Sequence, residues 1–374
     1  MSDSQRNLAL DVFRGMTVCF MIIVNSPGTW DIAYGPLLHA PWHGFTPTDL
    51  VFPSFLFAVG NAMAFSMHKY EAQGESVFWQ KTIKRTLIIF LLGFLLSWFP
   101  FFRQVEGIGW EFKPLGETRI LGVLQRIALC YFFASIIIHY GSKKVALWFS
   151  AFALLGYWIL SYAFGEANDP YSLVGNAALK LDLFLFGENH LYHGEGIAFD
   201  PEGLLSTLPS IVNVIGGYLA GDYIRRRGNT YEVVAKLCLV ASLLILVALT
   251  WHMAFPINKK LWTSSFVLLT VGIDVLILGV LIFLIEIQHR RKWTPFFLVF
   301  GKNPLFIYVL ADLLITILYM VPVGDQNLQQ AFFQDVLLKI ASPINASFLF
   351  AIIFMLICWS IGYILDKKRI YIRV

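Results

Sequence analysis

Apolar residues along this chain come in long, unbroken blocks rather than alternating with polar residues. Each block is close to the roughly 20 residues that a helix needs to cross a hydrocarbon core of about 30 Å. A membrane-spanning strand would show short alternating segments, so the pattern predicts helices, whose backbone groups hydrogen-bond within the segment. About ten spans are predicted from these blocks. They cover residues 8–27, 49–68, 84–102, 120–139, 145–164, 204–224, 232–254, 262–286, 295–320 and 345–366.

Composition supports an all-α, polytopic membrane helix bundle. Hydrophobic residues make up 57% of the 374 residues, charged residues 14%, and the mean hydropathy is +0.67. Soluble domains contain nearer 25% charged residues. No linker or repeat divides the chain, so we expect one domain over residues 1–374. The cysteines fall inside predicted spans, which indicates neither a disulfide framework nor a metal site.

Lysine and arginine predict the orientation of the spans. They gather in every second connection, at Lys81–Arg85, Lys143–Lys144, Arg225–Arg227, Arg290–Lys292 and Lys367–Arg369. Cytoplasmic loops carry this excess, so these connections and, with an even number of spans, both termini are predicted to be cytoplasmic. The first span is too long for a cleaved signal and is expected to be retained. The net charge of +4 therefore reflects topology, and we expect no nucleic-acid partner.

The predicted outer loops are long and hold most of the candidate chemistry, because long loops are commonly functional. In the first of them, the imidazole of His39 can accept a proton near neutral pH or attack an acyl carbon. Asn25, at the outer end of the first span, can donate a hydrogen bond to an oxyanion or orient that imidazole. The alternative is an interfacial histidine beside aromatic anchors.

Two further outer segments look like helix starts. Thr46-Pro47-Thr48-Asp49 is typical of a capping box, and this role holds even if Asp49 also contacts His39. Asp200-Pro201-Glu202-Gly203 likewise places Asp200 at an N-cap.

A third outer segment contains Lys259 and Lys260, two cations on the side where cations are otherwise few. They indicate a functional role, and the alternative is that both lysines snorkel beside Trp262.

Several ionisable residues fall at membrane depth, where each costs roughly 2.5–3.5 kcal/mol on insertion scales unless it is paired or faces water. They are Arg14, Arg126, Asp274, Lys302 and Asp312. Together they indicate a polar interior, which suits an enzyme or a transporter. Arg14 and Lys302 lie near predicted cytoplasmic ends, where they can meet an anionic cofactor or simply snorkel.

Several short motifs along the chain resemble those of known membrane acyltransferases and occur in the same order. Leu10–Gly15 resembles the first-helix signature of several transmembrane acyltransferase families, and His39–Pro53 resembles the heparan-α-glucosaminide N-acetyltransferase family with its bacterial homologues. Further matches follow in the same order. They are Gly122–Arg126, Leu191–His193, Asp200–Gly203, Asn258-Lys259 with Leu261-Trp262, and Gly301–Asn303 with Tyr308.

The resemblance implies transfer of acetyl from cytosolic acetyl-CoA to the amine of a glucosamine-type sugar across the membrane. It places the active-site histidine on His39 and the nearby asparagine on Asn25, with Asp49 as a third catalytic candidate. The chain departs from the lysosomal enzyme at His43, at extra residues around Thr29–Pro36, and in lacking its luminal domain. A compact bacterial form in the cytoplasmic membrane is therefore implied, and a homodimer is suggested.

The remaining candidate residues fall into two groups, and no metal is expected. Those for binding acetyl-CoA are Arg14, Arg126, Lys302 and Asn303. Those for binding the amino sugar are Trp42, His43, Asp200, Glu202, Asn258, Lys259 and Trp262. The competing hypothesis is an amino-sugar transporter of the inner membrane, although the sequence shows no inverted repeat.

Overall fold

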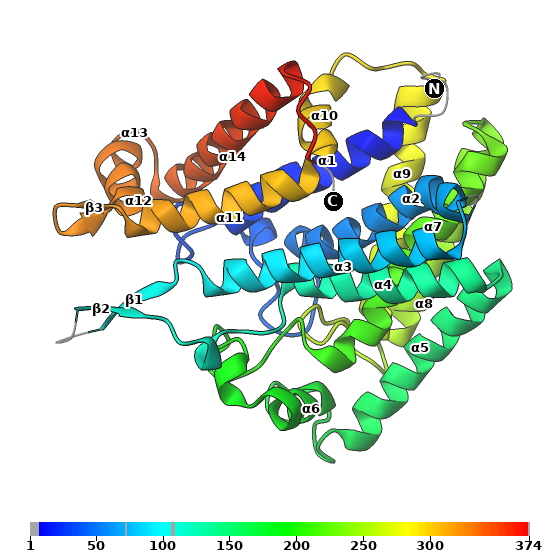
Figure 1. Ribbon diagram of the computed structural model, residues 1–374, viewed down its shortest axis with the longest axis horizontal. Helices are drawn as coiled ribbons and strands as arrows, with labels where there is room; N and C mark the ends of the chain where they lie inside the picture. The colour runs from blue at the N-terminus through cyan, green and yellow to red at the C-terminus, as the bar shows by residue number, and fades with distance from the viewer. Residues whose placement is uncertain (1–6, 72, 106–108, 373–374) are drawn as a thin grey trace. The chain divides into compact units, whose positions relative to one another are not determined.

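The computed structural model describes residues 7–71, 73–105 and 109–372, and helices dominate it (Figure 1). The predicted all-α class is confirmed. The α-helices are α1 (Leu8–Asn25), α2 (Val51–Glu71), α3 (Glu75–Trp98), α4 (Val123–Tyr140), α5 (Lys143–Phe164), α6 (Ala177–Phe186), α7 (Leu204–Arg227), α8 (Tyr231–Trp251), α9 (Ser264–Leu281), α10 (Thr294–Lys302), α11 (Pro304–Met320), α12 (Leu328–Ala331), α13 (Leu338–Ile340) and α14 (Pro343–Lys367).

Short elements connect these helices. Two antiparallel hairpins are formed by β1 (Phe102–Val105) with β2 (Gly109–Phe112) and by β3 (Pro322–Val323) with β4 (Gln326–Asn327). The single-turn 3₁₀ segments are η2 (Gly35–Leu37), η3 (Pro47–Leu50), η4 (Leu115–Glu117) and η5 (Glu188–His190), and the π-helical ones are η6 (Ile282–Ile287) and η7 (Phe332–Leu337).

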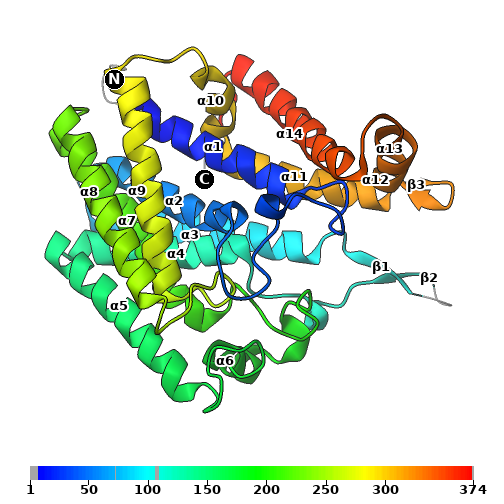
Figure 2. The same cartoon turned by 180° about the vertical axis from the view of Figure 1, so that it is seen from behind.

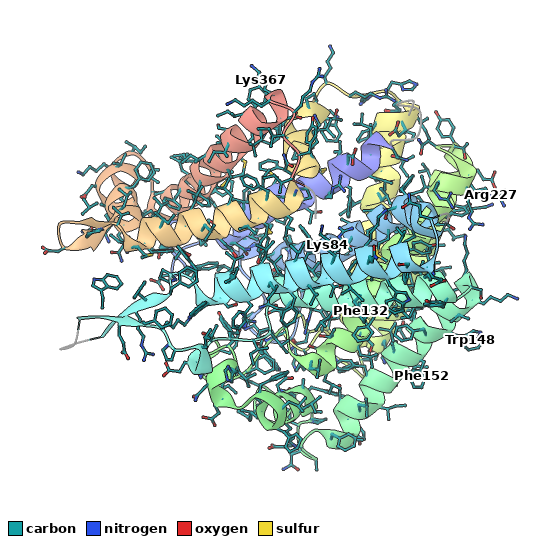
Figure 3. The ribbon with its side chains drawn as sticks, in the orientation of Figure 1. Lys84, Phe132, Trp148, Phe152, Arg227 and Lys367 are labelled. Atoms are coloured by element: carbon teal, nitrogen blue, oxygen red, sulfur yellow. The ribbon has the colours of Figure 1, made fainter. Side chains whose placement is uncertain are left out.

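Within the described residues, eight helices are long and apolar enough to cross a membrane, or nine if a bent pair counts as one span. These nine match nine of the predicted blocks. The other block, 84–102, lies in α3, a 24-residue helix that does not qualify. Lys81, Lys84 and Arg85 put three cations in its first half. Large apolar side chains such as Trp148 and Phe152 of α5 are exposed, as expected for a lipid-facing surface (Figure 3).

The predicted span 295–320 is broken in the structure. Helices α10 and α11 meet at an angle of 83° on either side of Asn303. Pro304 lacks a backbone N–H and disfavours helical geometry in the preceding residue. Asn303 accordingly has φ −131° and ψ 50°, outside the helical region. The proline therefore explains why one apolar block became two helices.

The chain separates into two compact units. Among the described residues, unit 1 consists of those up to His39, those of Thr46–Phe55 and those from Val280 onward. Unit 2 consists of the described residues of Ala40–Phe45 and Leu56–Gly279. In unit 1, α1 packs against α10, α11 and α14 (Figure 2). In unit 2, α4 packs against α3, α5 and α7, and α7 also contacts α5, α6 and α8.

Close backbone contact joins α1 to α10 in unit 1. A Cβ atom on Gly15 would lie 1.9 Å from the carbonyl oxygen of Phe297, and one on Gly301 would lie 2.4 Å from that of Asp11. Small residues allow this approach, which is how membrane helices gain packing energy without a hydrophobic driving force. Unit 1 thus joins the first helix of the chain to its last third.

We expect Gly15→Ala to destabilise the protein, because the added methyl group forces α1 away from α10. Overpacking of this kind typically costs about 1–3 kcal/mol. Thermal unfolding of the purified protein in detergent would show a lower midpoint. The matched control is Gly156→Ala in α5, where an added Cβ meets nothing within 4 Å. An equal response of the two variants would contradict the packing argument.

Candidate active site

His39 and Asp49 form the central contact of unit 1. The His39 Nδ1 atom lies 2.6 Å from the Asp49 Oδ1 atom. The Asp49 side chain is 1% exposed, whereas that of His39 is 34% exposed. A carboxylate that accepts from Nδ1–H fixes the ring and places the lone pair on Nε2. The pair therefore has the geometry of a histidine oriented for proton transfer.

Asp49 also holds the start of η3. Its Oδ2 atom accepts a hydrogen bond from the backbone N–H of Thr46, with N and O 2.9 Å apart, and lies 3.1 Å from the Thr46 hydroxyl oxygen. The same hydroxyl donates to the Leu38 carbonyl oxygen at 2.7 Å. The structure thus shows both contacts expected for Asp49. Because the cap ties residue 38 to residue 46, it sets the loop that carries His39.

Asn25 is the last residue of α1 and its side chain is exposed. Within the described residues it forms no hydrogen bond with His39 or Asp49. The loop that follows is fixed by Gly28, whose N–H donates to the Ser347 carbonyl oxygen at 3.1 Å and whose carbonyl oxygen accepts from Gln329 Nε2 at 2.6 Å. These contacts anchor the segment in which the chain departs from the family pattern.

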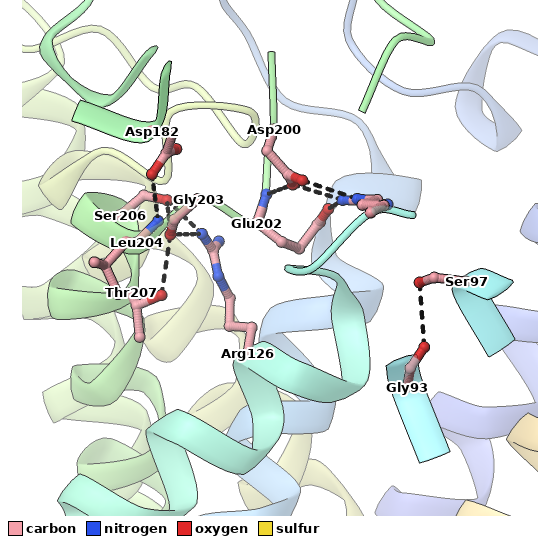
Figure 4. A network of polar contacts seen from close by, with 11 residues as sticks. Gly93, Ser97, Arg126, Asp182, Asp200, Glu202, Gly203, Leu204, Ser206 and Thr207 are labelled. Carbon is pink, nitrogen blue, oxygen red and sulfur yellow. Dashed lines mark hydrogen bonds and ion pairs between the residues drawn. The ribbon is translucent and has the colours of Figure 1, made fainter. Parts of the chain in front are cut away.

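Asp200 and Glu202 of unit 2, labelled in Figure 4, are both contacted by Arg119. Its Nε and Nη2 atoms donate to the two Asp200 oxygens at 2.8 and 2.6 Å, and Nη2 also lies 2.6 Å from Glu202 Oε2. The guanidinium group stacks on the Tyr192 ring, 4.8 Å from its centroid. Asp200 and Glu202, both predicted to bind the sugar, therefore share one cation, which the sequence analysis missed.

Burial and charge act in opposite directions on these two carboxyl groups. Burial raises the pKa of Asp200 above its usual range despite the Arg119 contacts. Burial also opposes ionisation of Glu202, but the charges of Arg119, Lys259 and Arg126 hold its pKa below the usual range. Glu202 is consequently the more strongly ionised member of the pair.

The expected helix cap at Asp200 is wrong. Helix α7 begins at Leu204, and the backbone N–H of Leu204 donates to Asp182 Oδ1 at 3.0 Å. Asp200 instead accepts from the backbone N–H of Glu202 at 2.9 Å. The reason is spatial: α6 brings Asp182 to the start of α7, and Arg119 draws Asp200 away from it.

Arg126 is completely buried in the first turn of α4. Its Nη2 atom donates to the Gly203 carbonyl oxygen at 2.9 Å and to the Ser206 hydroxyl (Figure 4). The guanidinium also lies over the Trp262 ring, 5.0 Å from its centroid. Nε and Nη1 have no hydrogen-bond partner within the described residues. A buried guanidinium edge of this kind is suited to an oxygen atom of a ligand or water.

The remaining predicted sugar-binding residues all lie in unit 2. Asn258 Nδ2 lies 3.3 Å from His43 Nδ1, and Trp42 Nε1 donates to the Tyr171 carbonyl oxygen at 2.8 Å. Burial lowers the pKa of His43, which favours its neutral form. Trp262 Nε1 donates to Asn213 Oδ1 at 3.0 Å.

Segment Ala40–Phe45 is attached to the loop before α9. The Gly44 N–H donates to the Ile257 carbonyl oxygen at 2.8 Å. Lys260 Nζ donates to the Pro41 carbonyl oxygen at 2.9 Å and pairs with Glu195 at 2.5 Å. Lys260, which runs against the charge pattern, therefore has a structural partner.

The predicted cofactor-binding residues of unit 1 gather at the break between α10 and α11, hereafter the junction. Arg14 Nε donates to the Gly301 carbonyl oxygen at 2.9 Å. Lys302 Nζ contacts both Asp366 oxygens, at 2.7 and 2.8 Å. Asn303 donates from Nδ2 to the Ile370 carbonyl oxygen at 3.0 Å and accepts at Oδ1 from the Ile372 N–H at 2.9 Å. The junction is thus already occupied by the segment that follows α14.

Sequence reasoning missed three residues of these clusters: Arg119, Asp182 and Asp366. Arg119 is a cation on the predicted outer side, where cations are fewer, and this was a usable signal. Asp182 interrupts the apolar run of α6, and Asp366 places a negative charge in the last turn of α14, against the helix dipole. Among the described residues no group of three or more His, Cys, Asp or Glu side chains is arranged to hold a metal ion.

Comparison with known proteins supports the predicted resemblance. Residues 6–181 match the family model described as "Heparan-alpha-glucosaminide N-acetyltransferase, catalytic". The chain is 29% identical over 357 residues to the heparan-alpha-glucosaminide N-acetyltransferase of Homo sapiens and 27% identical over 362 residues to that of Mus musculus. These alignments cover 80% and 82% of this chain and 52% and 53% of the relatives. The resemblance is confirmed, and the chain spans about half the length of the curated relatives it matches.

The raised pKa of Asp182 predicts that the stability of the folded protein depends on pH. Burial raises its pKa to about 7, although the Leu204 N–H lowers it. Between about pH 4 and pH 7 the unfolded chain has lost the Asp182 proton while the folded chain retains it, so stability should fall as pH rises and level off above pH 7. A shift of this size corresponds to about 4 kcal/mol.

Unfolding midpoints of the purified protein at pH 5 and pH 8 would measure this effect. In Asp182→Asn, the amide oxygen replaces the carboxyl oxygen that accepts from the Leu204 N–H, and the side chain no longer titrates. This variant should reduce the difference between the two midpoints. Asp325→Asn, at an exposed position, is the matched control. An unchanged pH dependence in Asp182→Asn would show that another group is responsible.

Proposed function

We propose that this chain is a multi-pass membrane N-acetyltransferase of a bacterial cytoplasmic membrane. It transfers acetyl from cytosolic acetyl-CoA to the amine of a glucosamine-type sugar at the periplasmic face. The observation that carries the proposal is the contact between His39 and Asp49. It lies inside the region that matches the family model, and both relatives are named as glucosaminide N-acetyltransferases.

The chemistry requires a base, because a sugar ammonium must lose a proton before its nitrogen can attack a thioester. In the proposed reaction, His39 Nε2 takes that proton and the Asp49 carboxylate stabilises the resulting imidazolium. The new C–N bond forms and the C–S bond breaks. The departing thiolate receives the proton held by His39, and the second proton that the nitrogen loses on becoming an amide goes to solvent. Asn25 is proposed to donate to the oxyanion formed in between. Transfer through an acetyl-histidine would use the same pair, with Nε2 as nucleophile.

Unit 2 is proposed to supply contacts for the sugar. Such a ligand offers hydroxyl groups and an amine, which carboxylates, amides and aromatic faces bind well. The candidates are Trp42, His43, Asp200, Glu202, Asn258, Lys259 and Trp262. Arg126 is proposed to donate from Nε and Nη1 to an oxygen of the acetyl donor, since these atoms have no partner within the described residues.

The junction is proposed to bind the anionic part of acetyl-CoA. Lys302 is held between two carboxylate oxygens of Asp366, and a phosphate group presents the same kind of acceptor. In this proposal the donor phosphate replaces Asp366 on Lys302, while Arg14 and Asn303 line the same junction. Asp366 and the donor would then compete for one cation.

The alternative is an amino-sugar transporter. The broken span α10–α11 favours it, because discontinuous helices often surround transport sites. Such folds usually carry two broken helices at corresponding positions, whereas one bent pair is found among the described residues. Accumulation of unmodified labelled glucosamine in vesicles, with no acetylation of it, would identify the transporter.

We expect His39→Ala to reduce acetyl transfer by roughly 10²–10⁴-fold, the usual contribution of a general base. Purified protein would be given labelled acetyl-CoA and glucosamine, and N-acetylglucosamine would be measured. Donor affinity should be retained, because His39 acts on the acceptor. His193→Ala, an exposed histidine of another predicted outer loop, is the matched control and should keep full activity. Near wild-type turnover in His39→Ala would refute its role as the base.

Competition at the junction predicts opposite effects of two substitutions. Lys302→Ala should weaken CoA binding by roughly 10–100-fold, the value of one charge-assisted contact, whereas Asp366→Asn should strengthen it by removing the competing carboxylate. Calorimetric titration of CoA into the purified variants would measure both. Lys368→Ala, which removes an exposed cation two residues after Asp366, is the control. Unchanged affinity in Lys302→Ala would show that Lys302 only joins α10 to α14.

A further inference from the structure

One face of α3 changes from polar to apolar along its length. A shallow, open groove lies on this face, and only residues of α3 line it. Its polar lining comes from the beginning of the helix, at Ser76, Gln80 and Lys84. Its apolar lining follows, at Ile83, Leu87 and Ile88. A groove with one polar and one apolar end matches an amphiphile better than a sugar or a nucleotide.

The apolar row has the length of one membrane leaflet. Leu87, Leu91 and Leu95 repeat every four residues and are 55%, 56% and 45% exposed, so they form a continuous outward row. From Lys84 to Leu95 the helix rises about 17 Å, close to half of a hydrocarbon core of about 30 Å. When the row lies among acyl chains, Lys84 is therefore at headgroup depth.

Lys84, labelled in Figure 3, is an exposed cation of this turn. Its neighbours are engaged: Lys81 Nζ donates to Gln73 Oε1 at 2.8 Å, and Arg85 lies over the Tyr131 ring, 4.6 Å from its centroid. Within the described residues Lys84 has neither a hydrogen bond nor an ion pair. Its side chain is exposed and lines the groove.

Aromatic side chains lie at the polar end of the groove. Trp79 lines the groove, and its Nε1 atom donates to the Tyr140 hydroxyl oxygen at 3.0 Å. That hydroxyl donates in turn to Glu75 Oε2 at 2.7 Å. Tryptophan and tyrosine are enriched where headgroups meet acyl chains. Trp79 precedes Lys84 by five residues, so it lies about 7.5 Å further from the leucine row, on the headgroup side.

We propose that the first half of α3 binds an anionic phospholipid, with its phosphate at Lys84 and one acyl chain along Leu87, Leu91 and Leu95. Charge complementarity selects this occupant, since Lys84 lines the polar end of the groove and has no hydrogen bond or ion pair within the described residues. A second copy of this chain is less suited to the groove, because the helix that packed there would have to present an acidic side chain to Lys84. The site is independent of the acetyl-transfer proposal.

Quenching of Trp79 fluorescence tests the site directly. The purified protein would be placed in nanodiscs containing phosphatidylcholine and a rising fraction of brominated phosphatidylglycerol or brominated phosphatidylcholine. The difference between each protein and its Trp79→Phe counterpart isolates the signal of Trp79 from the other tryptophans. We expect half-maximal quenching at roughly fivefold less phosphatidylglycerol than phosphatidylcholine, the preference that one cation near an anionic surface confers.

Substitutions of Lys84 decide the cause of that preference. Lys84→Gln should abolish it, and Lys84→Arg should retain it, which also shows that the site tolerates a changed side chain. Lys144→Gln, at an exposed cation in the first turn of α5, should leave it unchanged. Equal quenching by the two lipids in the unsubstituted protein, or an undiminished preference in Lys84→Gln, would overturn the proposal. Protection of Trp79 from both lipids would indicate a protein occupant and would overturn it as well.

Discussion

Charged side chains that leave water need partners, and this requirement organises much of the structure. The buried Asp222 at the end of α7 contacts Lys143 at 2.5 Å, Arg225 at 2.7 Å and Arg226 at 2.9 Å. Arg119 is shared by two carboxylates, and Lys302 is held by Asp366. Removing one partner of a fully buried pair typically costs 3–5 kcal/mol, and less where a partner is partly exposed, as Lys143 and Lys302 are. These clusters join elements that are distant in the sequence.

The same requirement extends to the backbone at irregular points. Where α10 stops at the junction, the Gly301 carbonyl oxygen accepts from Arg14, and where α7 starts, the Leu204 N–H donates to Asp182. Free helix ends in an apolar medium would leave such groups unsatisfied. Both units therefore use an ionisable side chain from another helix to complete a helix end. These ends are also where the candidate functional residues gather, which suggests why ionisable groups are retained there.

Local patterns in the sequence predicted what local physics determines. The apolar blocks predicted nine of the spans, and the local pattern Thr46-Pro47-Thr48-Asp49 predicted the capping box that the structure shows. Long-range partners left no such pattern. Arg119 meets Asp200 across 81 residues and Lys302 meets Asp366 across 64, so neither contact follows from spacing. Asp200 was assigned to a cap for this reason: the sequence shows its neighbour Pro201 but not the competing arrival of Asp182 from α6.

The composition of unit 1 has a consequence for the order of events during synthesis. Arg14 receives its Gly301 partner 287 residues later, and Asn303 receives Ile370 and Ile372 after a further 67 and 69 residues. At about 5–20 residues per second, the ribosome needs roughly 15–60 s to make the segment between Arg14 and Gly301. All of unit 2 is translated in that interval. Helix α1 is therefore made long before α10, and its contact surface at Gly15 cannot pack against α10 until the last third of the chain has been synthesised.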